Sequence, residues 1–142
     1  MACLSGAATG CGSLPSAALE VAESATTFEV MAVDPGSQAA AAEDFHGHRI
    51  VWRTLVTDPA VQERILGIVN GGISRFATQA RCFNPRHGVR VSRGARTVDI
   101  VICYECGSVH VHDGESFTSL PTTNVQPDLD EVFDKLASKA PK

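Results

Sequence analysis

The sequence predicts one α+β domain, in which an antiparallel β-meander sheet has two helices packed on one face. Short runs rich in β-branched residues follow one another between residues 79 and 120, and Gly-containing turns separate them. Apolar residues recur at helical spacing in two other segments, each of which opens with a proline. The chain of 142 residues is long enough for one domain with a modest core.

The N-terminal part of the chain differs in composition from the rest. Of 18 alanines, 12 lie in the first 42 positions, and no periodicity is visible there. We therefore expect residues 1–27 to form a disordered tail or an incomplete lipoprotein-type signal and tether, and residues 28–142 to form the domain. Cys11 follows a run of small residues similar to the processing site of bacterial lipoproteins, so it is a candidate for lipidation and membrane tethering. The segment lacks the basic region and apolar stretch of an export signal, so a cytoplasmic location stays open beside a secreted or envelope one.

The first half of the domain predicts two strands and a helix. Residues 28–33 alternate weakly before an Asp-Pro-Gly turn, and residues 48–56 are rich in β-branched side chains. Asp58 is placed to cap a helix that begins at Pro59, because its carboxylate can accept the free N–H groups of the first turn. The apolar stripe of this helix consists of Val61, Ile65, Ile68 and Val69.

Residues 79–120 predict the meander. If the strands at residues 88–92 and 97–102 pair so that the numbers of partners sum to 189, apolar residues share one face and Arg90 lies opposite Asp99 on the other. A later Asp-Gly pair indicates a second hairpin turn, between residues 108–112 and 115–120. Apolar positions change from even to odd numbers between these hairpins, so we expect a bulge or tight turn between Cys103 and Ser108, with Gly107 as its natural place.

The last predicted helix begins at Gln126-Pro127. Acidic residues lead this helix, and Lys135 and Lys139 close it, which matches the helix dipole. Its apolar stripe consists of Leu129, Val132, Phe133 and Leu136.

The formal net charge of −4 is the sum over three segments of the chain that differ in the sign of their charge. Residues 49–96 carry nine arginines against two acids, and the segments on either side are acidic. An Arg-rich block attracts phosphates or acidic partners, but no aromatic residues are interleaved with these arginines. We therefore expect the arginines to pair with the acidic blocks, and we expect no nucleic-acid partner. The length excludes a two-domain cofactor enzyme, and nucleophile-elbow, phosphate-loop and His-Glu-x-x-His motifs are absent.

Three cysteines and one histidine flank the first predicted hairpin: Cys82, His87, Cys103 and Cys106. A hairpin returns the chain to where it left, so we expect these residues to lie close together. We favour a disulfide between Cys82 and one member of the Cys-x2-Cys pair, which suits an exported protein. A zinc-type site of all four residues is the alternative. Against it, strand alternation places His87 on the same face as core residues, so its side chain would point into the core. Inert buried thiols are a third possibility, and redox activity is disfavoured because the pair follows a strand and not a helix N-terminus.

The remaining histidines form two pairs, His46-Gly-His48 and His110-Val-His112. Residues two apart on a strand share a face, so each pair could offer two imidazoles to a metal ion. Polar residues that alternate with valine are more typical of a solvent-facing strand, and we adopt that interpretation.

Two segments carry a resemblance. Cys82-Phe-Asn-Pro-Arg-His-Gly88 and Val101-Ile-Cys-Tyr-Glu-Cys106 resemble the Cys-Phe-x-Pro-Arg-His-Gly and Ile-Cys-Phe/Tyr-Glu-Cys motifs of an uncharacterised family of small bacterial proteins. The similarity extends to Phe45-His46-Gly47, Gln126-Pro127 and Phe133, and so covers roughly residues 28–136. Members of the family are often exported or lipid-anchored. The resemblance therefore implies where the site lies and a cell-envelope or secreted location, but no reaction.

From these observations we predict a non-enzymatic exported domain without a cofactor. The cysteines, together with Pro85, Arg86 and His87, would form a rigid structural or ligand-binding corner in which Arg86 contacts an anion. The alternative is a zinc-binding or thiol-dependent enzyme, in which His87 is a ligand or a proton-transfer partner.

Overall fold

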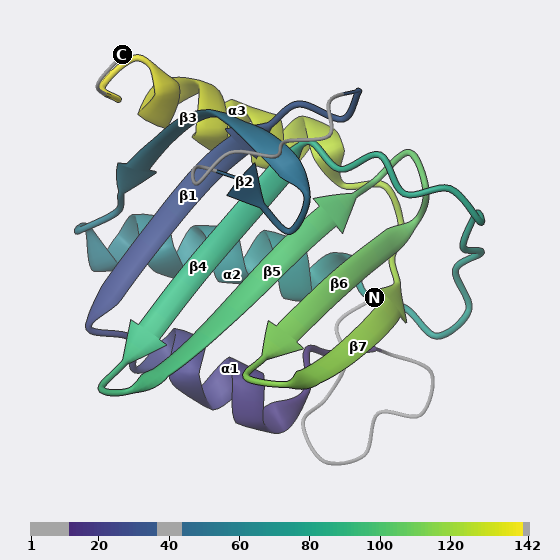
Figure 1. The fold of residues 1–142 in the computed structure, drawn as a ribbon, viewed down its shortest axis with the longest axis horizontal. Helices are drawn as coiled ribbons and strands as arrows, with labels where there is room; N and C mark the ends of the chain where they lie inside the picture. Colours follow the sequence, from purple (N-terminus) through teal and green to yellow (C-terminus); the bar gives the residue numbers. More distant parts are fainter. Residues whose placement is uncertain (1–11, 37–43, 141–142) are drawn as a thin grey trace.

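The computed structural model describes residues 12–36 and 44–140, and these form one curled antiparallel sheet of seven strands with three helices (Figure 1). The predicted α+β class with an antiparallel sheet is confirmed. The order of the strands across the sheet is β2-β3-β1-β4-β5-β6-β7. The strands are β1 (Thr27–Val33), β2 (Asp44–Phe45), β3 (His48–Leu55), β4 (His87–Arg93), β5 (Arg96–Cys103), β6 (Ser108–Asp113) and β7 (Ser116–Pro121), and the helices are α1 (Ser16–Glu23), α2 (Pro59–Gly72) and α3 (Gln126–Ala137).

Helix α1 lies in the segment that we expected to be a tail. Its Ala18, Val21 and Ala22 are buried, and Leu14 precedes them in the same cluster. These four residues recur at helical spacing, but two of them are alanines, and the abundance of alanine in this segment hides the stripe from a sequence pattern. Residues 14–23 therefore belong to the folded unit. Residues 1–11, including Cys11, lie outside the described residues, so lipidation there stays a prediction.

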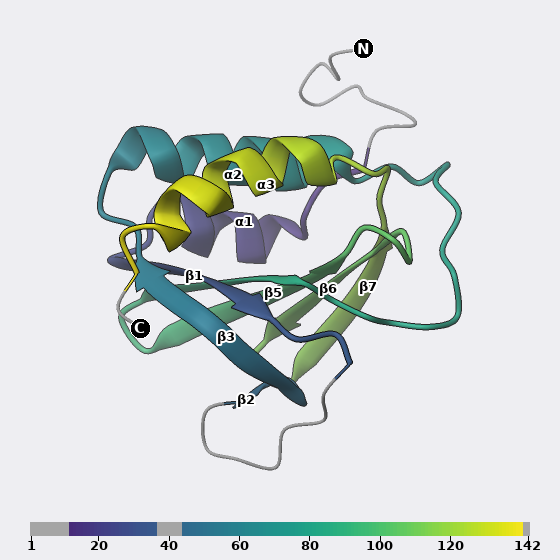
Figure 2. The same ribbon diagram turned by 90° about the horizontal axis from the view of Figure 1, so that it is seen from above.

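The main core lies between the sheet and the helices, which occupy the same side of the sheet in Figure 2. Within α2, the side chain of Asp58 accepts a hydrogen bond from the Ala60 N–H at 2.9 Å, and Pro59 is the first helical residue, as predicted. In α3, Asp128 lies in the first turn and Lys135 in the last, as predicted, whereas Lys139 lies beyond the end of the helix at Ala137. The large side chains buried to less than 2 % exposure in this core include Phe28, Val30, Ile65, Val69, Val89, Val91, Ile100, Ile102 and Leu129.

The pairing of β4 with β5 follows the predicted register. Val89 lies opposite Ile100 and Arg90 opposite Asp99, so partner numbers sum to 189 throughout. The tight turn predicted before Ser108 is also present, because Cys103 pairs with Ser108 and Gly107 between them has a φ of +67°. The second hairpin turns at Gly114, whose φ is +61°.

A second, smaller core lies on the opposite face of the sheet. The short strand β2 turns into β3 through His46 and Gly47, whose φ values of 51° and 87° are those of a tight hairpin turn. This hairpin carries Phe45 back against the sheet, where it is 1 % exposed. The buried members of this core are Met31, Val33, Phe45 and Val101, with Ile50 and Phe83 packed against them. None of the described helices is both long and apolar enough to cross a membrane.

Candidate functional site

The cysteine pair forms a disulfide, but with a different pairing from the one we favoured. Cys103 is bonded to Cys106, and Cys82 carries a free, exposed thiol. The turn between β5 and β6 brings the Cα atoms of Cys103 and Cys106 to 5.2 Å, within the range that a disulfide spans. Positive φ at Gly107 lets the chain reverse within these few residues. The local turn thus lets Cys103 and Cys106 form a disulfide with each other, without Cys82.

Cys82 nevertheless lies beside the disulfide. Its Sγ is 3.9 Å from the Sγ of Cys106. Backbone contacts on both sides fix this approach: the Ala80 N–H donates to the carbonyl of Cys106 at 2.8 Å, and the Asn84 N–H donates to its Sγ at 3.3 Å. The three cysteines thus form one sulfur cluster, here called the cysteine corner.

His87 is not part of the cysteine corner. It pairs with Ile102 in the sheet, and its ring packs against Phe133 and Tyr104, with centroid separations of 5.0 and 6.0 Å. Its Nε2 lies 2.7 Å from Oδ1 of Asp130 on α3. Because side chains alternate across a strand, His87 faces the helices while Cys103, which follows Ile102, faces the other way. The four predicted zinc ligands therefore do not converge, and within the described residues no group of three or more His, Cys, Asp or Glu is placed to hold a metal ion.

A pocket of about 190 Å³ forms where β1, β3 and β4 meet α3. Two residues predicted to bind a ligand, Arg86 and His87, both line it. Helix α3 supplies two aspartates, Asp130 and Asp134, which no sequence motif indicates. Burial lowers the pKa of His87 below its usual 6.5, although the hydrogen bond to Asp130 opposes this effect. The imidazole is therefore neutral at pH 7, and its Nε2–H donates to Asp130. The lining consists of Ala32, Val33, Trp52, Arg86, His87, Asp130, Phe133 and Asp134.

We expect the free energy of unfolding to fall as the pH is lowered from 7.5 to 5.5. The unfolded chain protonates His87 near pH 6.5, whereas the folded chain does so only at lower pH because the side chain is buried. The unfolded state thus binds more protons in this window, and stability rises with pH. Burial also lowers the pKa of His110 and His112, so they add to the effect.

Urea unfolding at the two pH values measures this dependence. His87→Gln removes the most buried of these titrating groups and should flatten the pH dependence in part, while His110→Gln removes a less buried one and should flatten it less. The same pH dependence in His87→Gln as in the unchanged protein would contradict the assignment.

The sheet face opposite the helices carries a row of rings, where the sequence predicts an ordinary solvent-facing strand surface. His46 and His112 stack with centroids 3.8 Å apart, and Phe83 and His110 stack at 3.6 Å. Phe117 joins the two stacks, at 5.0 Å from each of His110 and His112. The contact between His46 and His112 thus links one residue of each predicted histidine pair. Separation along the chain explains why no sequence pattern indicated this arrangement.

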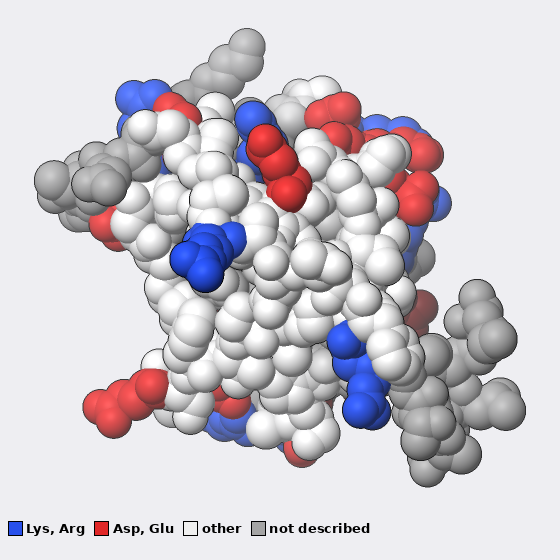
Figure 3. Space-filling view, turned by 90° about the vertical axis from the view of Figure 1, so that its right-hand side faces the viewer, with Lys and Arg blue, Asp and Glu red and all other residues white. Residues whose placement is uncertain are grey.

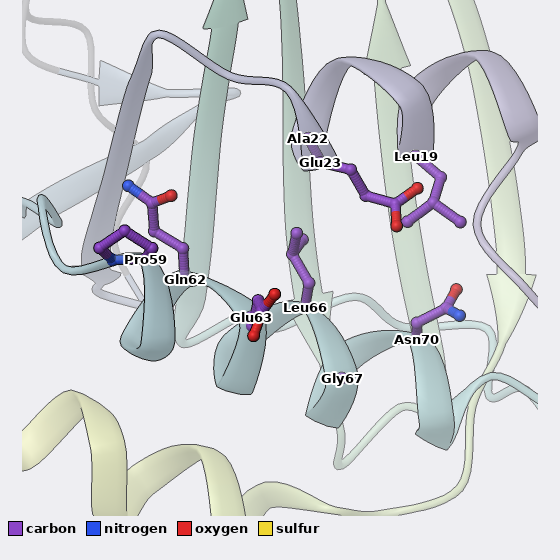
Figure 4. A pocket seen from close by; sticks show the side chains of 9 residues that line it. All are labelled: Leu19, Ala22, Glu23, Pro59, Gln62, Glu63, Leu66, Gly67 and Asn70. Atoms are coloured by element: carbon purple, nitrogen blue, oxygen red, sulfur yellow. The ribbon is translucent and has the colours of Figure 1, made fainter.

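Two further surface features lie away from these sites. A groove of about 370 Å³ runs between α1 and α2, and Figure 4 shows Leu19 and Glu23 of α1 on one side and Leu66 and Asn70 of α2 on the other. Figure 3 views the side that holds β7 and the loop between α2 and β4, and most of its described surface belongs to residues without a charge. Phe76, which is 78 % exposed, belongs to that loop. Comparisons with protein-family models, with curated proteins and with solved structures find no match to this chain.

Proposed function

We propose that this protein is a small ligand-binding domain rather than an enzyme, and that its pocket at Arg86 and His87 takes a zwitterion of about amino-acid size. One observation carries the proposal: the lining combines a guanidinium, two carboxylates and two aromatic rings in a space of about 190 Å³. A ligand that carries both an ammonium and a carboxylate group matches this set of charges.

The acidic and aromatic residues of the pocket suit the ammonium group. Asp130 and Asp134 lie one turn apart on α3, and both line the pocket. Trp52 packs edge to face on Phe133, with centroids 5.8 Å apart, so that aromatic surface adjoins the carboxylates. Cations are attracted both to carboxylates and to the faces of aromatic rings.

The backbone of Arg86 is held in place by hydrogen bonds. Binding a ligand therefore costs little conformational entropy at this position. Its N–H donates to the carbonyl of Ile102 at 3.2 Å, and its carbonyl accepts the N–H of Val33 at 3.0 Å. The disulfide begins one residue after Ile102, so the cysteine corner braces the strand end to which Arg86 is attached. The exposed guanidinium is then available for the carboxylate of the ligand.

Titration of the isotope-labelled protein with L-alanine and γ-aminobutyrate, followed by amide NMR shifts, tests the proposal. At least one zwitterion should give saturable shifts at Val33 and at Arg86 to Gly88, and methylammonium and acetate should bind more weakly because each engages only one end. We expect Arg86→Met and Asp134→Asn each to weaken binding about tenfold, because each variant removes one charge-assisted hydrogen bond to the ligand.

The matched control is Arg81→Met, which removes an exposed arginine from the same loop but outside the pocket. Its affinity should equal that of the unchanged protein. No saturable shift with either zwitterion, or equal affinity in Arg86→Met, would refute the proposed function.

A further inference from the structure

The cysteine corner contains a free thiol in addition to its disulfide, and a purely structural disulfide does not need one. Cys103 and Cys106 are each 1 % exposed, so a thiol in solution has no direct approach to their bond. Cys82 is exposed, and its sulfur lies 3.9 Å from that of Cys106. A free thiol is thus placed between solvent and a buried disulfide, in contact with one of its two sulfurs.

We infer that Cys82, Cys103 and Cys106 form a thiol–disulfide relay, in which Cys82 connects the buried disulfide to a dithiol or disulfide of a partner molecule. This activity is separate from the proposed ligand binding, because it uses different residues on the other side of the strand end.

The first step of the relay is internal and needs no oxidant. Cys82 loses its proton to solvent, and its thiolate attacks the Sγ of Cys106. The Cys82–Cys106 bond forms as the Cys103–Cys106 bond breaks, and Cys103 leaves as a thiolate that then takes up a proton. The Cys106 N–H, which donates to the Sγ of Cys103 at 3.1 Å, is placed to stabilise the leaving thiolate.

The second step exchanges electrons with the partner. One thiolate of a partner dithiol attacks the exposed Sγ of Cys82, and Cys106 leaves as a thiolate. The second thiol of the partner then attacks the mixed disulfide, which releases Cys82 and leaves the partner oxidised. Overall, one disulfide in this protein is reduced to two thiols, and one dithiol is oxidised to a disulfide.

The loop that carries Cys82 is built to keep the nucleophile near its target. Hydrogen bonds from Ala80 and from Asn84 to Cys106 lie two residues before and two residues after Cys82. Stacking of Phe83 on His110 holds the same loop to β6. Attack on Cys106 therefore needs only a small movement of one side chain.

Reduction by dithiothreitol under native conditions tests the relay. The full-length oxidised protein and its Cys82→Ser variant are incubated with dithiothreitol at pH 8, quenched with an alkylating reagent and assayed by peptide mass spectrometry for the Cys103–Cys106 bond. We expect the bond to be reduced at least tenfold more slowly in Cys82→Ser. In 6 M guanidinium chloride the two rates should become equal, because unfolding removes the need for an exposed thiol. Equal rates in the folded proteins would overturn the relay.

A second variant tests the bond that the relay must form. In Cys103→Ser the disulfide is absent, and Cys82 and Cys106 remain as neighbours. Mild oxidation of this folded variant with oxidised dithiothreitol should give a Cys82–Cys106 disulfide within one chain. Failure to form it, while circular dichroism shows an intact fold, would overturn the relay as well. Neither experiment involves Arg86 or the pocket, so the relay and the proposed ligand binding stand or fall separately.

Discussion

Replacing Gly107 by alanine should lower the free energy of unfolding by about 3 kcal/mol, whereas the same replacement at Gly114 should cost about 1 kcal/mol. Both glycines have similar positive φ values, +67° and +61°, so an alanine carries the same backbone strain at either position. The two positions differ in the room that is available for an added Cβ atom. A Cβ on Gly107 would overlap the carbonyl oxygen of Thr78, but a Cβ on Gly114 would meet no atom within 4 Å.

The loop that carries Thr78 cannot easily retreat from such a clash. The Ala80 N–H is bonded to the carbonyl of Cys106, and the Thr122 N–H is bonded to the carbonyl of Gly107 itself. Loss of glycine flexibility in the unfolded chain affects both variants alike and cancels in their difference. Urea unfolding of the two variants gives the comparison, and equal losses of stability would show that the turn has more freedom than its contacts imply.

Replacing Asp99 by alanine is the second large change, with an expected cost of about 2 kcal/mol at pH 7, below the range for a fully buried charge pair because the Arg90 side chain is partly exposed. The side chain of Asp99 is 11 % exposed and receives two hydrogen bonds from Arg90, at 2.7 and 2.9 Å. The Nε2 of His46 lies 2.8 Å from its second oxygen. Without the carboxylate, Arg90 and His46 would lose their shared partner, although both side chains keep some contact with solvent.

Asp113 provides the control, since it pairs with Arg96 at 2.8 Å but is more exposed, so Asp113→Ala should cost about 0.5 kcal/mol. Burial raises the pKa of Asp99, but the hydrogen bonds from Arg90 and His46 outweigh burial and leave the pKa below 3.8. The stabilisation by Asp99 is therefore complete above pH 3.8 and is lost as the pH falls through the lowered pKa. Chemical unfolding at pH 7 measures both variants, and similar costs would mean that Asp99 does not organise this face of the sheet.

Local rules predicted the parts of the fold that depend on neighbouring residues. The Arg90–Asp99 pair follows from strand alternation within one hairpin, and the cap at Asp58 follows from the first turn of one helix. The turn at Gly107 was predictable because apolar residues on a regular strand cannot change faces. Each of these features is determined within about 20 residues of chain.

The candidate sites were predictable only in part, because distant segments complete them. The pairing of Cys103 with Cys106 depends on how a short turn folds, and the spacing of the cysteines did not distinguish it from a bond to Cys82. Asp130, the partner of His87, comes from a helix 43 residues later in the chain. The stack of His46 on His112 likewise depends on the β2–β3 hairpin turning back over the sheet.

The position of β1 has a consequence for how the chain reaches this fold during synthesis. Although β1 is made before the other strands of the described residues, it lies in the interior of the sheet, with β3 on one side and β4 on the other. The β3 edge can be covered early, but the other edge stays unpaired until residues 87–93 have been made. An unpaired edge next to apolar side chains favours association with other chains. A nascent chain of this protein therefore passes through an interval in which a chaperone that shields exposed strand edges would raise the yield of folded molecules.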